Sequence, residues 1–134
     1  MAKQMYLVIV DYGAGTDISP ECVFNNGVKA TEYVQKLNDH TEKIESLLLK
    51  LKPWDNRYED RRPFPNSKSF KTSDQHYNAG KAYNIKKESE LTVLLEAEYA
   101  KELVDLHISA AKFAEDRYQM RDGTRSVITV PVND

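Results

Sequence analysis

A short and almost continuous apolar segment, YLVIVD at 6–11, is the first clear pattern in the sequence. A run of this length is typical of a β-strand that is covered on both faces or lies centrally in a sheet. Residues 20–24 (PECVF) alternate acidic and apolar side chains and predict a second, more exposed strand. Residues 126–132 (SVITVPV) predict a third strand, at a sheet edge, because Pro131 cannot donate a hydrogen bond to a neighbour.

Two longer segments repeat apolar residues in steps of four and three, which predicts helices over 28–52 and 89–118. The repeated positions are Ala30, Val34, Leu37, Thr41, Ile44, Leu48 and Leu51 in the first segment, and Leu95, Tyr99, Leu103, Leu106, Ala110 and Phe113 in the second. This spacing keeps one apolar stripe facing a partner helix. We therefore expect a long antiparallel helical hairpin.

Local signals place the ends of these helices. The stretch Asn25-Asn26-Gly27 supplies capping side chains before the first helix, and Ser89 is a candidate cap for the second. Pro53 is expected to stop the first helix, because the residue before a proline is pushed out of the helical region. The stretch 53–88 then has no clear period and is interpreted as an inter-helix loop, which six aromatic residues are expected to hold in an ordered state.

These elements predict an α+β fold in a single domain, 1–134, with a small antiparallel sheet packed on the helical hairpin. Its strands are expected at 6–11, 20–24 and 126–132. The two apolar stripes hold more surface than three short strands can cover, and exposing that surface to water is unfavourable. A homo-oligomer is therefore expected.

Composition narrows the class of protein. The chain has 19 Lys and Arg residues against 21 Asp and Glu residues, so its net charge does not favour binding to nucleic acid or to an anionic membrane. The single cysteine excludes an intramolecular disulfide and suits a reducing cytoplasm. The apolar run at the start is too short for a signal peptide or a membrane span.

The turn GAGTDI at 13–18 could be a phosphate-binding loop or the corner of a hairpin. A dinucleotide fingerprint needs a third small residue followed by a helix, whereas Ile18 stands there and Pro20 follows. A P-loop would need a Gly-Lys-Ser/Thr ending, which the sequence lacks. The hairpin corner is therefore the favoured interpretation, in which Gly13 and Gly15 let the backbone turn.

No arrangement typical of catalysis or metal binding is found in the sequence. The three histidines, His40, His76 and His107, lie far apart and match no metal-ligand spacing. Cys22 follows Glu21, whose carboxylate would raise the pKa of a thiol and so oppose a reactive thiolate. We therefore expect a protein that is not an enzyme and that uses no metal and no cofactor.

Two clusters of cationic and aromatic residues are the candidate ligand-binding positions. Arginine beside aromatic rings suits bidentate contacts to phosphate together with stacking on a planar base. The first cluster is Trp54, Arg57, Arg61 and Arg62, and the second is Lys112, Arg117, Tyr118, Arg121 and Arg125. Acidic residues interleave with both clusters, so ordinary surface ion pairs are the alternative interpretation.

The segments YLVIVDYGAGTDISP, CVF and KATEYVQKLN, which cover about the first 38 residues, resemble small proteins encoded by tailed phages. The size of the chain, its long helices and the Arg121/Arg125 pair are also similar to the Thoeris anti-defence sponges, phage proteins that sequester a cyclic ADP-ribose signal in an oligomer. The second resemblance implies a role in ligand binding for Arg121 and Arg125.

Two functions of different class follow. One is a non-catalytic counter-defence protein of phage type that binds and sequesters an anionic nucleotide signal in the host cytoplasm. The alternative is an inhibitor that docks on a host enzyme through the 53–88 loop and a helix face. An enzyme with catalytic groups from distant positions is the third possibility.

Overall fold

The computed structural model describes residues 3–12, 18–120 and 123–132. These residues form two compact units, each described here by itself. The first, called the sheet unit, consists of Met1–Glu45 and Gln119–Asp134. The second, called the helical unit, consists of Ser46–Tyr118. Helix α1 (Gly27–Arg61) contributes its first half to the sheet unit and its second half to the helical unit.

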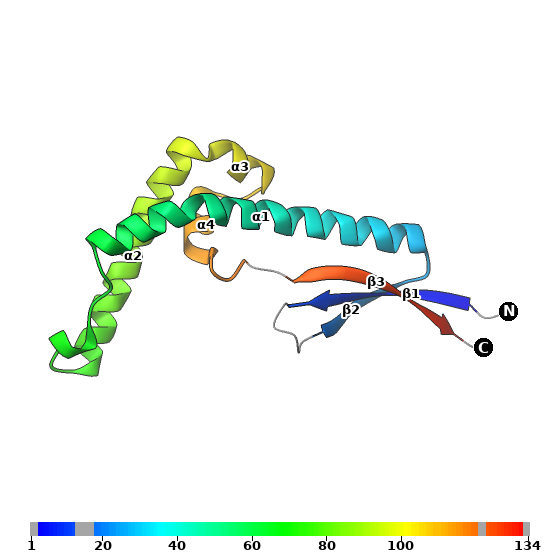
Figure 1. Ribbon diagram of the computed structural model, residues 1–134, viewed down its shortest axis with the longest axis horizontal. Helices are drawn as coiled ribbons and strands as arrows, with labels where there is room; N and C mark the ends of the chain where they lie inside the picture. Colours follow the sequence, from blue (N-terminus) through cyan, green and yellow to red (C-terminus); the bar gives the residue numbers. More distant parts are fainter. Residues whose placement is uncertain (1–2, 13–17, 121–122, 133–134) are drawn as a thin grey trace. The chain divides into compact units, whose positions relative to one another are not determined.

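The sheet unit contains the three expected strands, each slightly longer than the sequence pattern indicated (Figure 1). They are β1 (Lys3–Asp11), β2 (Ile18–Phe24) and β3 (Thr124–Val132), in the order β2-β1-β3 with both pairs antiparallel. The expected α+β class is therefore confirmed, with the continuous apolar strand in the centre. The 13–17 turn lies outside the described residues.

One face of this sheet is covered by the first half of α1. Val8 and Val10 of β1 are buried, as are Ala30 and Ile44 of the helix. The close approach at the start of the helix depends on Gly27, where an added Cβ would lie 3.0 Å from the ring of Tyr6. Burial of this face supplies the hydrophobic stabilisation of the sheet unit.

Helix α1 begins as the sequence predicted and ends later. The side chain of Asn26 accepts hydrogen bonds from the backbone N–H groups of Val28 and Lys29, at 2.9 and 3.2 Å. The expected stop at Pro53 is wrong, because the helix continues to Arg61. Pro53 leaves the carbonyl of Leu49 without its helical donor, but Leu49 is 69% exposed, so water can hydrate that carbonyl.

The helical unit is built from the second half of α1 and three further helices, α2 (Ser73–Glu98), α3 (Ala100–Asp105) and α4 (Ala110–Asp116). A 3₁₀ turn, η1 (Ser67–Ser69), lies between α1 and α2. The core of the helical unit consists mainly of buried side chains, namely Leu47, Leu51, Leu91, Leu95, Leu103 and Phe113. In Figure 1 helix α4 lies against α2.

The expected loop at 53–88 is wrong in its extent. Most of this stretch is helical, and α1 and α2 leave only 62–72 between them. Helix α2 is capped by Thr72, whose hydroxyl accepts a hydrogen bond from the N–H of Gln75 at 3.2 Å, and not by Ser89. The helical hairpin is therefore present, formed by α1 and α2 with other bounds than expected.

The expected single helix over 89–118 is divided into three pieces. Helix α2 ends at Glu98, α3 follows directly, and α4 begins after Ser109, whose hydroxyl accepts a hydrogen bond from the N–H of Lys112. Most of the apolar positions expected in this stretch, from Leu95 to Phe113, are nevertheless buried. The pattern therefore identified the buried side chains correctly, although the backbone that carries them changes direction.

Candidate functional site

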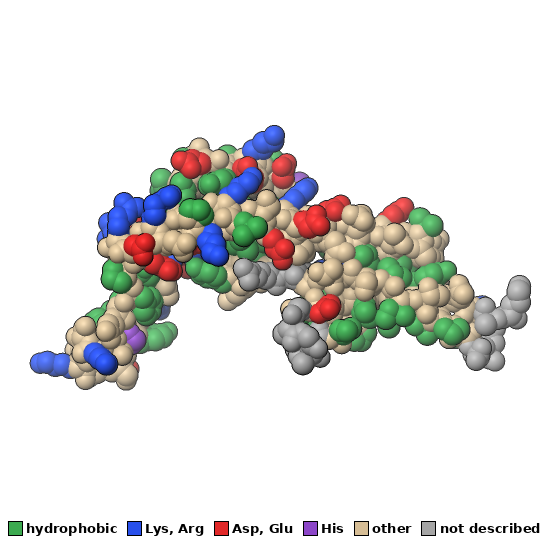
Figure 2. All heavy atoms as spheres, viewed as in Figure 1, with side chains coloured by type: hydrophobic (Ala, Val, Ile, Leu, Met, Phe, Trp, Pro, Cys, Tyr) green, Lys and Arg blue, Asp and Glu red, His purple; other side chains and the backbone are tan. Residues whose placement is uncertain are grey.

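The face of α1 beyond Pro53 carries aromatic and cationic side chains at helical spacing. Trp54, Tyr58 and Arg61 lie on neighbouring positions of this helix, and Arg62 is the first residue after its end. Together with Glu90 and Val93 of α2 they line a groove of about 370 Å³, called here the Trp54 groove. Figure 2 shows Lys and Arg side chains gathered near this end of α1.

Two aromatic rings form one wall of the Trp54 groove. The ring centroids of Trp54 and Tyr58 are 5.2 Å apart, and their planes are inclined by 31°. The guanidinium of Arg62 lies 5.9 Å from the centroid of the Tyr58 ring, within cation–π range. Tyr83 packs its ring edge-on against Tyr58 from α2, and its hydroxyl donates to the carbonyl of Arg62 at 2.7 Å. This wall is therefore held rigidly on both helices.

The polar groups of the Trp54 groove are only partly satisfied. Arg62 pairs with Glu90 at 3.2 Å, but both side chains are nearly half exposed. Arg61 makes one long contact, 3.5 Å from its Nε to the carbonyl of Arg57, and no described carboxylate pairs with it. The hydroxyl of Tyr58 is buried and has no hydrogen-bond partner among the described residues. Burial, together with the nearby carboxylate of Glu90, raises the pKa of Tyr58.

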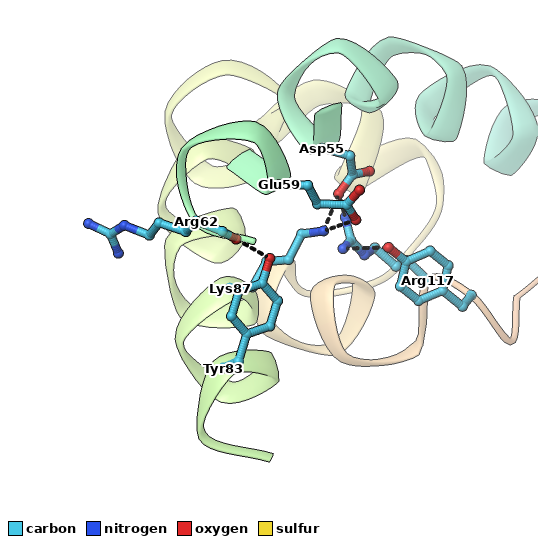
Figure 3. Close-up of polar contacts among 7 residues, drawn as sticks. Asp55, Glu59, Arg62, Tyr83, Lys87 and Arg117 are labelled. Carbon is cyan, nitrogen blue, oxygen red and sulfur yellow. Dashed lines mark hydrogen bonds and ion pairs between the residues drawn. The ribbon is translucent and has the colours of Figure 1, made fainter. Parts of the chain in front are cut away.

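Behind the groove lies a network of charges whose two cations are buried (Figure 3). The Nζ of Lys87 lies 3.2 Å from Asp55 and 3.0 Å from Glu59, and Nη1 of Arg117 lies 2.7 Å from Asp55. Lys87 is 5% exposed and Arg117 is 3% exposed. Asp55 of α1 therefore pairs with two buried cations, Lys87 of α2 and Arg117, the residue that follows α4.

The network keeps Lys87 charged despite its burial. Burial alone would lower the pKa of Lys87, but the hydrogen bond from its ammonium to Glu59 and the charge of Asp55 outweigh that effect, so the pKa is raised. A buried cation without such partners would be strongly destabilising. We therefore assign Asp55, Lys87 and Arg117 to the structural support of the site.

A second, smaller cavity of about 210 Å³, called the Lys87 pocket, adjoins this network. Its lining includes Lys87, Tyr83, Arg117 and Tyr118. Arg117 donates from Nη2 to the hydroxyl of Tyr118 at 2.9 Å, and its carbon Cζ lies 4.5 Å from that ring. The Nε of Arg117 is buried without a hydrogen-bond partner among the described residues. Arg117 and Tyr118 of the second cluster therefore lie at the Lys87 pocket, where Arg117 pairs with Asp55, whereas no member of the first cluster lines this pocket.

The remaining candidate residues lie elsewhere. Arg57 is exposed on α1 and does not line the Trp54 groove. Lys112 is exposed and pairs with Asp116 one turn later at 2.8 Å, and this hydrogen bond raises the pKa of Lys112. Arg121 lies outside the described residues. Of the nine candidates, the structure brings Trp54, Arg61 and Arg62 into one groove.

Arg125 belongs to the sheet unit, where its contacts join neighbouring elements of the fold. Its guanidinium makes two hydrogen bonds to Glu21, at 2.8 and 2.9 Å, and its backbone exchanges hydrogen bonds with the side chain of Asn38. Arg125 is 8% exposed. These contacts join β2, β3 and α1, and account for an arginine at a core position of a strand.

A third hollow lies on the other side of α2. Phe64, Tyr77 and Ile85 expose large apolar surfaces there, and the ring of Phe64 rests on Gly80, where an added Cβ would lie 2.8 Å from the ring. The hollow is about 450 Å³ and is called the Phe64 groove. Its composition is more apolar than that of the Trp54 groove.

Within 3–12, 18–120 and 123–132, no group of His, Cys, Asp and Glu side chains is arranged to hold a metal ion. None of the helices in the described part of the chain is long and apolar enough to cross a membrane.

Some residues that line or support the groove were not among the candidates chosen from sequence. Tyr58, Glu90 and Val93 line the Trp54 groove, and Lys87 supports it from behind. The spacing of three residues among Lys87, Glu90 and Val93 within α2 is a signal that places these three side chains near one another. Only Lys87 precedes the helix predicted from Ser89, and Glu90 and Val93 lie within that predicted helix.

Comparison of the chain with family models, with curated proteins and with solved structures found no match, so the functional proposal rests on the geometry of these grooves and on the sequence.

Proposed function

We propose that this protein is a non-catalytic binding protein that captures an anionic, planar, nucleotide-like ligand in the Trp54 groove. The observation that carries the proposal is the adjacency of the Trp54–Tyr58 ring pair to Arg61 and Arg62 at the end of α1, all lining one groove. Aromatic faces stack on a base, and guanidinium groups bind phosphate through charge-assisted hydrogen bonds. The groove offers both within reach of one small molecule.

The size and charge of the groove support this choice. A volume of about 370 Å³ is within the range typical of small-molecule sites, roughly 300–1,000 Å³. The pair Arg62–Glu90 is exposed, and such pairs contribute about 0–1 kcal/mol, so a phosphate can replace Glu90 at small cost. Arg61 has no described carboxylate partner and is available to a second anionic group.

The biological setting is part of the same proposal. The resemblance of the first residues to tailed-phage proteins supports a counter-defence role, in which the protein sequesters a nucleotide signal in the cytoplasm of the host. Sequestration needs no catalytic groups, because binding alone removes the signal from its receptor. Affinity carried by arginine–phosphate contacts should fall as ionic strength rises.

A thermal-shift screen of purified protein tests the proposal. The panel contains mononucleotides, ADP-ribose and its cyclic forms, and cyclic dinucleotides. A ligand that binds only the folded state, at 100 times its Kd, stabilises it by about 2.7 kcal/mol, which raises the melting temperature by several degrees. Absence of any shift across the panel at millimolar concentration would contradict the proposal.

Two variants assign a positive result to the groove. Arg61→Ala with Arg62→Ala should abolish the ligand-induced shift, because it removes both phosphate donors. Arg57→Ala is the matched control, since Arg57 is an exposed arginine of the same helix that does not line the groove. An equal loss in both variants would indicate a nonspecific effect of charge.

The second candidate function is docking on a host enzyme, and the Phe64 groove favours it. Phe64 is 52% exposed, Tyr77 is 68% exposed and Ile85 is 58% exposed, and the last two lie on one side of α2. Apolar side chains at such spacing fit a helix-sized surface of a partner. If the ligand screen is negative and Tyr77→Ala with Ile85→Ala removes a partner recovered from a bacterial lysate, this second function replaces the first.

A further inference from the structure

The sheet of the sheet unit carries polar residues of β3 on both of its faces, including the face that α1 covers. Residues paired in register lie on the same face, so Arg125 and Thr129 of β3 share a face with Val10 and Tyr6, the face that α1 covers. Antiparallel sheets with one open face normally place polar residues on that open face. Here, polar residues of β3 occur on the covered face.

The open face carries apolar residues on all three strands, and its uncharged polar positions are Thr124 and Ser126 near one end of β3. Leu7 of β1 lies between Val23 of β2 and Ile128 of β3, and Val130 lies beside Met5. Val23 is 53% exposed, Ile128 is 44% exposed and Val130 is 37% exposed. Figure 2 shows hydrophobic atoms along this part of the sheet unit. An apolar face of this extent indicates an interaction surface.

We propose that this open sheet face packs against the same face of a second copy of the chain, forming a two-fold symmetric dimer. Two sheets of the same twist pack face to face with their strands about 30° apart, so the surface is complementary to itself. It carries no charged side chain between the ends of β1, which leaves little to select a charged partner.

The charges at the ends of β1 fix the orientation of the two copies. Lys3 and Asp11 share the open face with Leu7, one at each end of the strand. A two-fold axis perpendicular to the strands sets the Lys3 end of one copy over the Asp11 end of the other, which is electrostatically favourable. An axis along the strands would instead bring like charges together. Asp11 also has an interaction within its own chain, and the preferred orientation holds with it in place.

The area of the open sheet face determines how tightly two copies are expected to bind. Three strands spaced about 4.8 Å apart, each rising about 3.3 Å per residue over nine residues in β1, give a face on the order of 400 Å² per copy before side-chain relief is included. Two such faces approach the lower limit of specific interfaces, about 1,000 Å² in total. We therefore expect a reversible dimer with a Kd on the order of micromolar.

Sedimentation velocity of the full chain over a dilution series tests the dimer. The wild type should shift from dimer to monomer across the micromolar range. Ile128→Glu with Val130→Glu should raise the Kd at least about tenfold, because each charge would be buried without a partner. Val104→Glu is the matched control: Val104 is 70% exposed on α3, and its replacement should leave the Kd unchanged.

A second measurement needs no variant and keeps the test decisive if the double variant does not fold. Isoleucine methyl resonances of the wild type are followed by NMR on dilution. Those of Ile9 and Ile128, on the open face, should shift with concentration, while that of the exposed Ile85 on α2 should not. A chain that stays monomeric at all concentrations, or a dimer whose shifts appear at Ile85 and not at Ile128, would overturn the proposal.

Discussion

At the scale of single residues, His107 determines how the chain leaves α3. It has a φ of 55°, in the left-handed region that favours glycine. Its N–H donates to the carbonyl of Val104, and the N–H of Ile108 donates to the carbonyl of Leu103, the hydrogen-bond pair of a Schellman motif. This motif lets the chain turn and begin α4 two residues later.

We predict that His107→Gly stabilises the protein by about 1 kcal/mol, because glycine adopts the left-handed conformation without a steric cost. His107 is exposed, so no packing is lost. Chemical denaturation followed by circular dichroism measures the change. His107→Ala is the control, since it removes the imidazole but keeps the Cβ. A glycine variant that is less stable than the alanine variant would show that another interaction of the motif dominates.

At the scale of elements, the strands and the start of α1 could be predicted, because their signals are local. The apolar run 6–11 requires a buried strand, and Asn26 can cap only the helix that follows it. The later helices were harder to predict. Pro53 gives a local stop signal, but burial of Leu51 and Tyr58 on either side, together with the ion pairs of Asp55, holds the helix through it.

The part of α2 before Ser89 could not be predicted, because its buried positions do not form an apolar stripe. Between Phe64 and Leu91 the positions that face the core carry Gly80 and Lys87. From sequence alone a lysine is predicted to be solvent-exposed, and only the positions of Asp55 and Glu59 on α1 explain why Lys87 is buried. The sequence identified Trp54, Arg61 and Arg62 on the α1 side of the groove. Glu90 and Val93, on the α2 side, lay within the predicted helix 89–118, but neither residue type points to ligand binding.

Helix α1 provides a test of this explanation. We predict that Pro53→Ala stabilises the protein by about 1–3 kcal/mol, because it restores the hydrogen bond to the carbonyl of Leu49 and relieves the clash of the ring. Pro53 is exposed, so its removal leaves no cavity. Differential scanning calorimetry measures the change, with Lys52→Ala as the neighbouring exposed control. A lower melting temperature for the alanine variant would mean that the proline ring makes a packing contribution of its own.

At the scale of the whole molecule, each compact unit contains buried cations that form ion pairs with carboxylates of another helix or strand. Arg125 pairs with Glu21 in the sheet unit, and Lys87 and Arg117 pair with Asp55 in the helical unit. Such pairs add little net stability over apolar side chains, but removing one partner is costly. These ion pairs determine which faces of the elements pack together. In the helical unit, the pair between Lys87 and Asp55 keeps α2 beside α1, and both helices line the Trp54 groove.

The raised pKa of Lys87 gives a pH dependence. A lysine whose folded pKa exceeds its unfolded value stabilises the fold below about pH 10.5, and this stabilisation is lost as the pH rises through the folded pKa. Lys87→Met should therefore cost about 1–3 kcal/mol at pH 7, and the difference from wild type should narrow above pH 10.5. Urea unfolding at pH 7, 9 and 11 measures it.

The exposed neighbour Lys86 supplies the control for this prediction, because Lys86→Met changes the same charge without removing a buried ion pair. Its stability should remain close to that of wild type at pH 7. A constant difference between wild type and Lys87→Met from pH 7 to pH 11 would contradict the role assigned to the charged form of Lys87.

Tryptophan fluorescence is the most direct test of ligand capture by the Trp54 groove. Trp54 is the only tryptophan in the chain, so its emission reports on the groove alone. Titration with the best nucleotide ligand of the thermal screen should change the emission with a saturable isotherm in wild type and Arg57→Ala, and leave it unchanged in Arg61→Ala with Arg62→Ala. A ligand that stabilises the protein without altering Trp54 emission, or that binds the double variant equally well, would contradict the site proposed here.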